Sequence, residues 1–208
     1  MRTWKTVASL IVLASTVSCG DVARQGRSPM YLVIDSLKGS SGNVTDEEAS
    51  DVLHSDVLTA VSSPEPCSAT SLCYAVFNDS GVVILRLSPK DVATPGVGNQ
   101  PSTNNQVTIN RYRVAYRRAD GRNTPGVDVP YAWDGAVTGT VPATGTASLA
   151  FELVRHTTKR EPPIVQLTRS PTTITTIADI TFYGRDQVGN DISVTGSIQV
   201  DFGDFGVQ

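Results

Sequence analysis

The sequence has 208 residues, 17 basic and 20 acidic side chains, and a formal net charge of −3. A chain of this length can bury one substantial core. Its acidic balance argues against general nucleic-acid binding, which requires a basic surface, so we expect no nucleic-acid partner.

The first 18 residues have the pattern of a signal peptide. Arg2 and Lys5 give a positive start, and the run Val7–Val17 carries no charge. That run is too short to cross a bilayer as a helix, which needs about 20 apolar residues. A basic start, a short apolar run and small residues near a cleavage site are typical of secretion. Loss of this segment takes the net charge from −3 to −5, because it removes two basic residues and no acid.

The residues around the expected cleavage site read Ser15-Thr16-Val17-Ser18-Cys19-Gly20. They resemble the lipobox of bacterial lipoproteins, although Thr16 stands where that family prefers Leu. The resemblance implies that Cys19 takes a lipid, with acyl chains such as palmitate, and becomes the new N-terminus. Gly20, in place of Asp, is compatible with sorting to an outer membrane or the cell surface. The alternative is ordinary cleavage nearby, which leaves a free thiol.

The next residues are polar and contain glycine, as in a linker. We therefore expect residues 19–29 to form a lipidated tether and residues 30–208 to form a single domain. With Cys19 lipidated, Cys67 and Cys73 remain as a pair, and an exported protein favours a disulfide between them. Metal binding is the alternative, but two thiols with two distant histidines make a poor ligand set.

The dominant pattern of the domain is an alternation of apolar and polar residues with period two, which predicts β-strands with one buried face. We expect such strands at 30–35, 72–77, 82–87, 107–118, 137–141, 147–154, 174–184 and 192–202. Within 107–118, Asn110, Tyr112, Val114 and Tyr116 are expected on the inner face. The turn formers Asn78–Gly81 predict a hairpin between 72–77 and 82–87.

Three stretches interrupt the strands. Residues 45–60 begin with Thr45-Asp46-Glu47-Glu48, a helix capping box, and we expect a short helical turn followed by a strand. Residues 88–106 and 119–136 are rich in turn-forming residues and predict two long loops, which in a compact domain are usually functional or disordered.

Two segments resemble bacterial immunoglobulin-like domains. INRYRVAYR at 109–117 is similar to the third strand of fibronectin type III and related folds. ITFYGRDQVGNDISVTGSI near the end resembles the last hairpin of such domains, with Asp186, Gly189 and Asn190 in its turn. The resemblance implies an all-β, immunoglobulin-like antiparallel β-sandwich with long loops. It departs from the family in that Trp133, the one Trp after the signal segment, stands in a loop.

No familiar catalytic motif occurs: the sequence has no G-x-S-x-G elbow, H-E-x-x-H, phosphate-binding loop or C-x-x-C. His54 and His156 lie far apart, and each reads best as an ordinary surface or satisfied histidine. We therefore expect a non-enzymatic protein without a cofactor.

Three groups of residues are candidate binding sites. Asp128, Tyr131, Trp133 and Asp134 could hold a sugar or peptide, or the two rings could close the open end of the sandwich. Arg111, Arg113 and Arg117 could meet phosphates or an acidic partner, or pair with acids of a neighbouring strand. Asp186, Asn190 and Asp191 form a weak calcium candidate that turn chemistry explains equally well.

The sequence thus predicts a membrane-anchored lipoprotein that serves as a binding or assembly module of the bacterial cell envelope. Its expected partners are the membrane, through the lipid, and an envelope protein or a glycan. The alternative is a glycan-acting hydrolase that uses acids of the 119–136 loop, for which two carboxylates must face each other.

Overall fold

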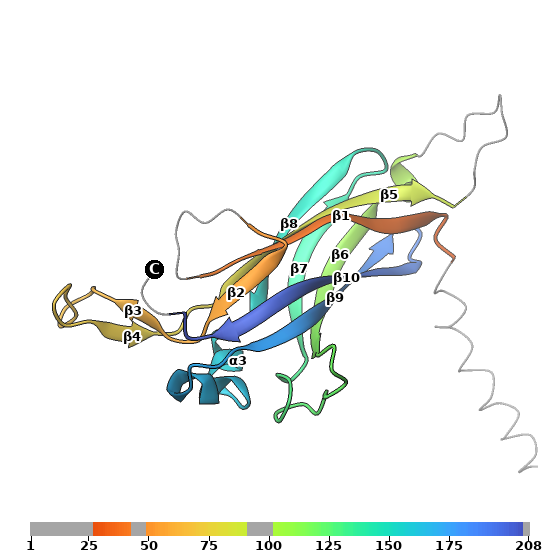
Figure 1. The fold of residues 1–208 in the computed structure, drawn as a ribbon. Coiled ribbons are helices and arrows are strands. Elements are labelled where there is room, and N and C mark those ends of the chain that lie inside the picture. The colour runs from red at the N-terminus through yellow and green to blue at the C-terminus, as the bar shows by residue number, and fades with distance from the viewer. Residues whose placement is uncertain (1–26, 43–48, 91–101, 206–208) are drawn as a thin grey trace, which may run out of the picture.

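The computed structural model describes residues 27–42, 49–90 and 102–205, and the lipidation and capping-box predictions at Cys19 and Thr45–Glu48 lie outside them. Two β-sheets pack face to face around a common core, so the predicted all-β sandwich is confirmed (Figure 1). One sheet has the strand order β1-β5-β8 and the other the order β2-β10-β9-β6-β7. Strands β3 and β4 form a third, two-stranded sheet.

The strands, in chain order, are β1 (Met30–Ser40), β2 (Val52–Asp56), β3 (Thr59–Val61), β4 (Cys73–Ala75), β5 (Asp79–Pro89), β6 (Val107–Arg117), β7 (Trp133–Val141), β8 (Thr146–Val154), β9 (Ile174–Asp186) and β10 (Asp191–Gly203). The short helices are η1 (Thr103–Asn105), α3 (His156–Arg160) and η2 (Ile164–Arg169). All strand pairs are antiparallel except β2 with β10, which is parallel. No helix in the described residues is long and apolar enough to cross a membrane.

The alternating segments form strands because their apolar faces meet between the two sheets. Strand β9 buries Ala178, Ile180 and Phe182, and β10 buries Val200 and Phe202, each at every second residue. Burying a side chain of this size contributes about 1.5–3 kcal/mol, so the pattern fixes which face of each strand turns inward.

Two tyrosines of β6 join the sheets by hydrogen bonds as well as by packing. The Tyr112 hydroxyl donates to the Glu152 carbonyl at 3.0 Å and accepts from the Glu152 N–H at 3.2 Å. The Tyr116 hydroxyl donates to the Leu153 carbonyl at 3.0 Å, and burial raises the pKa of Tyr116, so the hydroxyl keeps its proton. Because β8 is an edge strand, these bonds satisfy backbone groups that have no neighbouring strand.

The predicted hairpin between residues 72–77 and 82–87 is wrong. Strand β4 pairs with β3, whereas β5 begins at Asp79 and pairs with β1 and β8. The reason is that Asp79 is drawn into the interior, where its side chain is 0% exposed and bonded to the Lys159 ammonium of α3 at 2.8 Å. Residues that looked like turn formers therefore begin a central strand.

The carboxylate of Asp79 is a junction between distant segments. The backbone N–H of Gly42 donates to it at 3.0 Å and the Ser55 hydroxyl of β2 donates at 2.6 Å. Burial in this site raises the pKa of Asp79, while Lys159 opposes that rise through its charge and hydrogen bond. The Lys159 side chain is only 1% exposed, so both charges are shielded from water.

The strand predicted after the helical turn of residues 45–60 is present, since β2 and β3 lie in this stretch and Leu53 and Val57 enter the core; the turn itself, at Thr45–Glu48, lies outside the described residues. Two other predictions need correction. The loop predicted to end at residue 136 ends before β7, since Trp133 is buried and lies in that strand. Asn110 is exposed and not on the inner face, because an irregularity in register between Ile109 and Arg111 inserts one residue.

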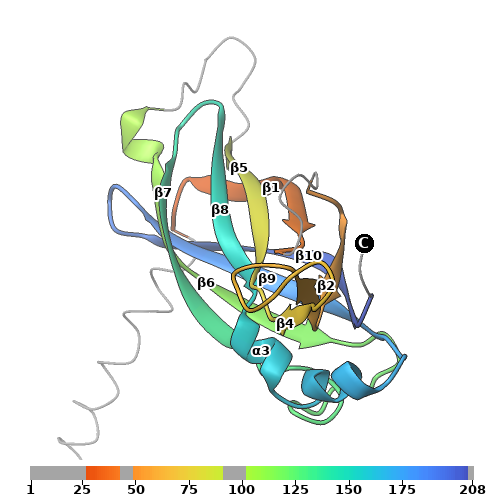
Figure 2. The ribbon, with the colours of Figure 1, turned by 90° about the vertical axis from the view of Figure 1, so that its left-hand side faces the viewer.

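The predicted cysteine pair is present at disulfide distance. Cys67 and Cys73 are joined, with their Cα atoms 5.4 Å apart. The bond closes the loop that connects β3 to β4, and these two strands with the loop project from the end of the sandwich (Figures 1 and 2). We call residues 59–77 the arm.

We expect Lys159→Met to lower the free energy of unfolding by about 3–5 kcal/mol, because it leaves the Asp79 charge buried without a partner. Urea unfolding of the wild-type and variant proteins measures the difference. The control is Arg160→Met, which changes the neighbouring, exposed residue of the same helix and should cost no more than about 0.5 kcal/mol. An equal decrease in the free energy of unfolding for both variants would show that the buried pair does not stabilise the fold more than an exposed residue does.

Candidate functional site

The three arginines of β6 lie on the outer face of the five-stranded sheet and pair with acids of the neighbouring strands. Arg113 and Arg111 reach Asp134 of β7 at 2.7 and 3.5 Å, and Arg117 reaches Asp179 of β9 at 2.7 Å. This is the cross-strand pairing that we weighed as the alternative to partner binding. Pairs this exposed contribute at most about 1 kcal/mol, so they organise the sheet surface more than they stabilise it.

The loop group of Asp128, Tyr131, Trp133 and Asp134 does not converge on one site. Trp133 is buried in the core, whereas Tyr131 is 51% exposed. The Asp134 carboxylate is engaged by arginines, and the Asp128 carboxylate accepts from the Thr124 N–H at 3.2 Å within its own loop. The structure thus separates a core residue, a surface residue and two acids with different partners.

The last hairpin uses its polar residues to build the turn between β9 and β10. Asp186 accepts from the backbone N–H groups of Val188 and Asn190 at 3.1 and 2.8 Å and from the Asn190 side-chain amide at 2.9 Å. Asp191 bonds instead to Arg185 at 2.6 Å. In the described residues no group of three or more His, Cys, Asp or Glu side chains gathers as metal ligands do. The oxygens of this turn therefore face donors of the protein itself.

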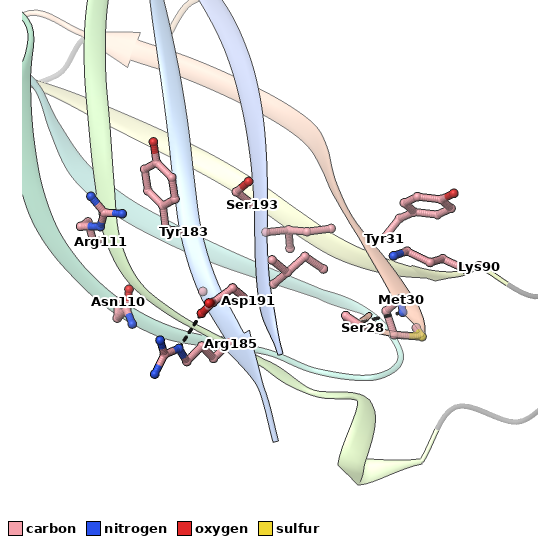
Figure 3. Close-up of a pocket in the computed structure, with 13 residues that line it drawn as sticks. Ser28, Met30, Tyr31, Lys90, Asn110, Arg111, Tyr183, Arg185, Asp191 and Ser193 are labelled. Carbon is pink, nitrogen blue, oxygen red and sulfur yellow. Dashed lines mark hydrogen bonds and ion pairs between the residues drawn. The ribbon is translucent and has the colours of Figure 1, made fainter. Parts of the chain in front are cut away.

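A pocket of about 500 Å³ lies where the start of β1 meets the β9–β10 hairpin and β6 (Figure 3). Arg111, Tyr183 and Asp191 form one side, and Tyr31 with Lys90 forms the other. The volume falls within the range of about 300–1,000 Å³ that is usual for small-molecule sites.

Charged and aromatic side chains are stacked in pairs on the walls of this pocket. The Arg111 guanidinium lies 4.0 Å from the centre of the Tyr183 ring, and the Lys90 ammonium lies 5.1 Å from the centre of the Tyr31 ring. Cation–π contacts of this kind attract each cation to the face of its ring, by about 0.5–1 kcal/mol at exposed sites. The pocket thus presents oriented hydrogen-bond donors beside exposed ring faces.

Sequence reasoning singled out two residues of the pocket, Arg111 and Asp191, but assigned them to different sites. Tyr31 of β1, Lys90 just after β5 and Tyr183 of β9 gave no signal, because only the fold brings these three segments together. The Asp79–Lys159 junction was also missed, since Asp79 was assigned to a turn and no prediction was made for Lys159.

Comparisons with protein-family models, with curated proteins and with solved structures found no significant match.

We expect Asp186→Ala to lower the free energy of unfolding by about 1–3 kcal/mol at neutral pH, because three hydrogen bonds of the turn lose their acceptor. Although burial opposes it, hydrogen bonding by Asn190, Ser28 and Val188 lowers the pKa of Asp186. A lowered folded pKa gives stability that is present above the unfolded value of about 3.9 and is lost as pH falls through the folded value.

The stability gap between wild-type and Asp186→Ala protein should therefore narrow below about pH 4. Thermal unfolding at several pH values, with and without calcium, measures it. A large rise in Tm of the wild-type protein on adding calcium, absent in the variant, would show instead that the turn holds the ion.

Proposed function

We propose that this protein is a membrane-anchored lipoprotein that acts as a binding or assembly module of the bacterial cell envelope, and that its arm contacts a partner protein. The observation that supports this most is the arm itself, a disulfide-closed projection with exposed apolar side chains. In the described residues, β3 and β4 pair only with each other, so the arm is an appendage of the sandwich and not part of its core.

The surface chemistry of the arm suits a protein partner. Tyr74 is 67% exposed, Leu72 43% and Phe77 36%, and they lie within six residues of one another. Glu65 is the sole charged residue of the arm sequence, so apolar contact outweighs electrostatic attraction here. Exposed aromatic side chains with few charges are typical of interface centres.

The disulfide prepares the arm for binding. In the chain-entropy model, closing a seven-residue ring lowers the conformational entropy of the unfolded chain. This loss of entropy stabilises the folded arm by about 2 kcal/mol. A short two-stranded sheet is marginal alone, so this constraint holds Tyr74 and its neighbours in place before a partner arrives.

The arm and the N-terminal end of the domain lie at opposite ends of the sandwich. Strand β1 starts at one end, beside the β9–β10 turn, and the arm projects from the other (Figure 1). A lipid on Cys19, followed by the tether of residues 19–29, would hold the first end at a membrane. The arm would then point away from that membrane toward other envelope components.

The strand order supports the immunoglobulin-like part of the proposal. The sheet order β10-β9-β6-β7 corresponds to the G-F-C-C′ order of such domains, and β1-β5-β8 corresponds to A-B-E. In this correspondence β6 is the third strand, as the resemblance at residues 109–117 implies. Domains of this type carry many unrelated functions, so the order bears on fold and not on activity.

The alternative, a glycan-acting hydrolase, receives less support from the geometry. It requires two carboxylates about 5–10 Å apart on either side of a bound sugar. Asp134 is held by Arg113 and Asp128 by Thr124, so the loop acids serve other partners.

We expect a photo-crosslinking amino acid at position 74 to give one discrete protein adduct in intact cells, because Tyr74 is the most exposed of the large apolar side chains of the arm. The control position is Thr138, exposed on the outer face of β7. Purified wild-type protein should compete for the adduct, and protein carrying Tyr74→Ser and Leu72→Ser should not. Adducts of equal yield at both positions, or none at position 74, would refute the role of the arm.

We expect Cys19→Ala to move the protein from the membrane fraction to the soluble fraction and to abolish incorporation of labelled palmitate. Acyl chains contribute about 0.8 kcal/mol for each buried CH₂, so their loss removes the anchor. Fractionation and mass spectrometry of the N-terminal peptide measure both effects. Cys67→Ala with Cys73→Ala is the matched control and should stay in the membrane; a membrane-bound Cys19→Ala protein would contradict lipid anchoring.

A further inference from the structure

We propose that the pocket at the N-terminal end of the sandwich binds a neutral glycan, with one sugar ring packed on Tyr183. The pocket lies where the start of β1 meets the β9–β10 hairpin and β6, at the opposite end of the domain from the arm (Figures 1 and 3). Glycan binding here is a second activity, which does not depend on the contact proposed for the arm.

The charged side chains of the pocket have partners in the protein, and this favours a ligand without charge. Arg185 bonds to Asp191 at 2.6 Å, and Arg111 lies 3.5 Å from the carboxylate of Asp134. Lys90 has partners of its own. A charged ligand would have to compete with these contacts. A sugar hydroxyl can instead bond to one of the five N–H donors of the Arg111 guanidinium while its contact with Asp134 stays in place.

A β-bulge turns two consecutive side chains of β6 to the outer face beside this pocket. Between Ile109 and Arg111, β6 has one residue more than β9, and both Asn110 and Arg111 are exposed. An unbroken strand would turn one of the two inward. Gly184 stands opposite Ile109 and permits the close approach, since a Cβ there would lie 2.6 Å from the Thr108 carbonyl oxygen. Bulges are frequent next to active sites because they redirect side chains in this way.

Two polar side chains of the pocket are available for hydrogen bonds to a ligand. Neither Asn110 nor Ser193 has a side-chain hydrogen-bond partner among the residues that the structure describes. The Asn110 amide both donates and accepts, and so does the Ser193 hydroxyl. The hydroxyl groups of a sugar also donate and accept, so each of these side chains can bond to one without losing a bond inside the protein.

An aromatic ring stands between these polar groups. Arg111, Tyr183 and Ser193 are directly opposite one another on β6, β9 and β10. The Arg111 guanidinium lies 4.0 Å from the centre of the Tyr183 ring, and the small Ser193 leaves space on the β10 side of that ring (Figure 3). A sugar ring has an apolar face of C–H bonds that can pack on tyrosine while its hydroxyl groups bond to polar neighbours. At about 500 Å³ the pocket can hold such a ring and part of the next one in a chain.

An array of neutral, acidic and amino-sugar oligosaccharides, probed with the labelled full chain, tests the proposal, and titration calorimetry measures the affinity for the glycan that binds best. We expect the bound glycans to be neutral. Their affinity should change less than twofold between about 0.05 and 0.5 M salt, because the ligand carries no charge that salt can screen. If no neutral glycan binds, or if acidic glycans bind best, the proposal is wrong.

Ser193→Trp should weaken glycan binding by about tenfold or more, because the larger side chain fills the space beside Tyr183. Thr195→Trp is the matched control: it changes the next exposed residue on the same face of β10, which does not line the pocket, and it should alter the affinity less than twofold. Asn110→Ala should weaken binding by about two- to tenfold, the loss expected for one hydrogen bond.

Thermal unfolding of the two Trp variants checks that both keep the fold. A Ser193→Trp protein that binds the glycan as tightly as wild type would overturn the proposal, since a glycan bound elsewhere does not need this space. Tyr74→Ser should not change glycan binding, so this test and the crosslinking of the arm can fail separately.

Discussion

The buried pair of Asp79 and Lys159 sets the condition that much of the fold must meet. Removing two ions from water costs several kcal/mol for each, and only close contact with further hydrogen bonds offsets that cost. Here the bonds come from Ser55 and Gly42, so β2, β5, α3 and the chain after β1 must all be in place at once. The pair therefore fixes how these segments are arranged at this end of the sandwich. It links β2, β5 and α3, which do not belong to one sheet.

The sandwich is held along its length by a different means. Tyrosines of β6 reach across the core to the edge strand β8, where Tyr112 bonds both backbone groups of Glu152. Around them the Phe151 ring packs edge to face against both Tyr112 and Phe182, with ring centroids 5.2 Å apart in each pair. Such ring pairs add about 0.5–1.5 kcal/mol beyond area burial, so packing and hydrogen bonding fix the same register.

Strands were predictable where burial alone decides the pattern, as in 147–154 and 192–202, because period-two alternation has one structural solution. The pairing of the β6 arginines was also foreseeable, since side chains two apart face the same neighbours. The hairpin predicted at Asn78–Gly81 was wrong, because Asp occurs both in turns and as a buried hydrogen-bond acceptor. The pocket could not be predicted, because Tyr31, Lys90 and Arg111 come from three separate segments of the chain and no local pattern indicates that they meet.

The placement of the arm opposite the start of β1 has a mechanical consequence. A pull between these two points runs along the strands, and the hydrogen bonds of antiparallel pairs lie across that direction. The eleven residues of β1 and the eleven of β5 would then share the load in shear over their whole pairing, in place of separating one bond after another. A sandwich pulled in this direction can transmit tension between the start of β1 and a molecule bound to the arm, while the core of the sandwich stays closed.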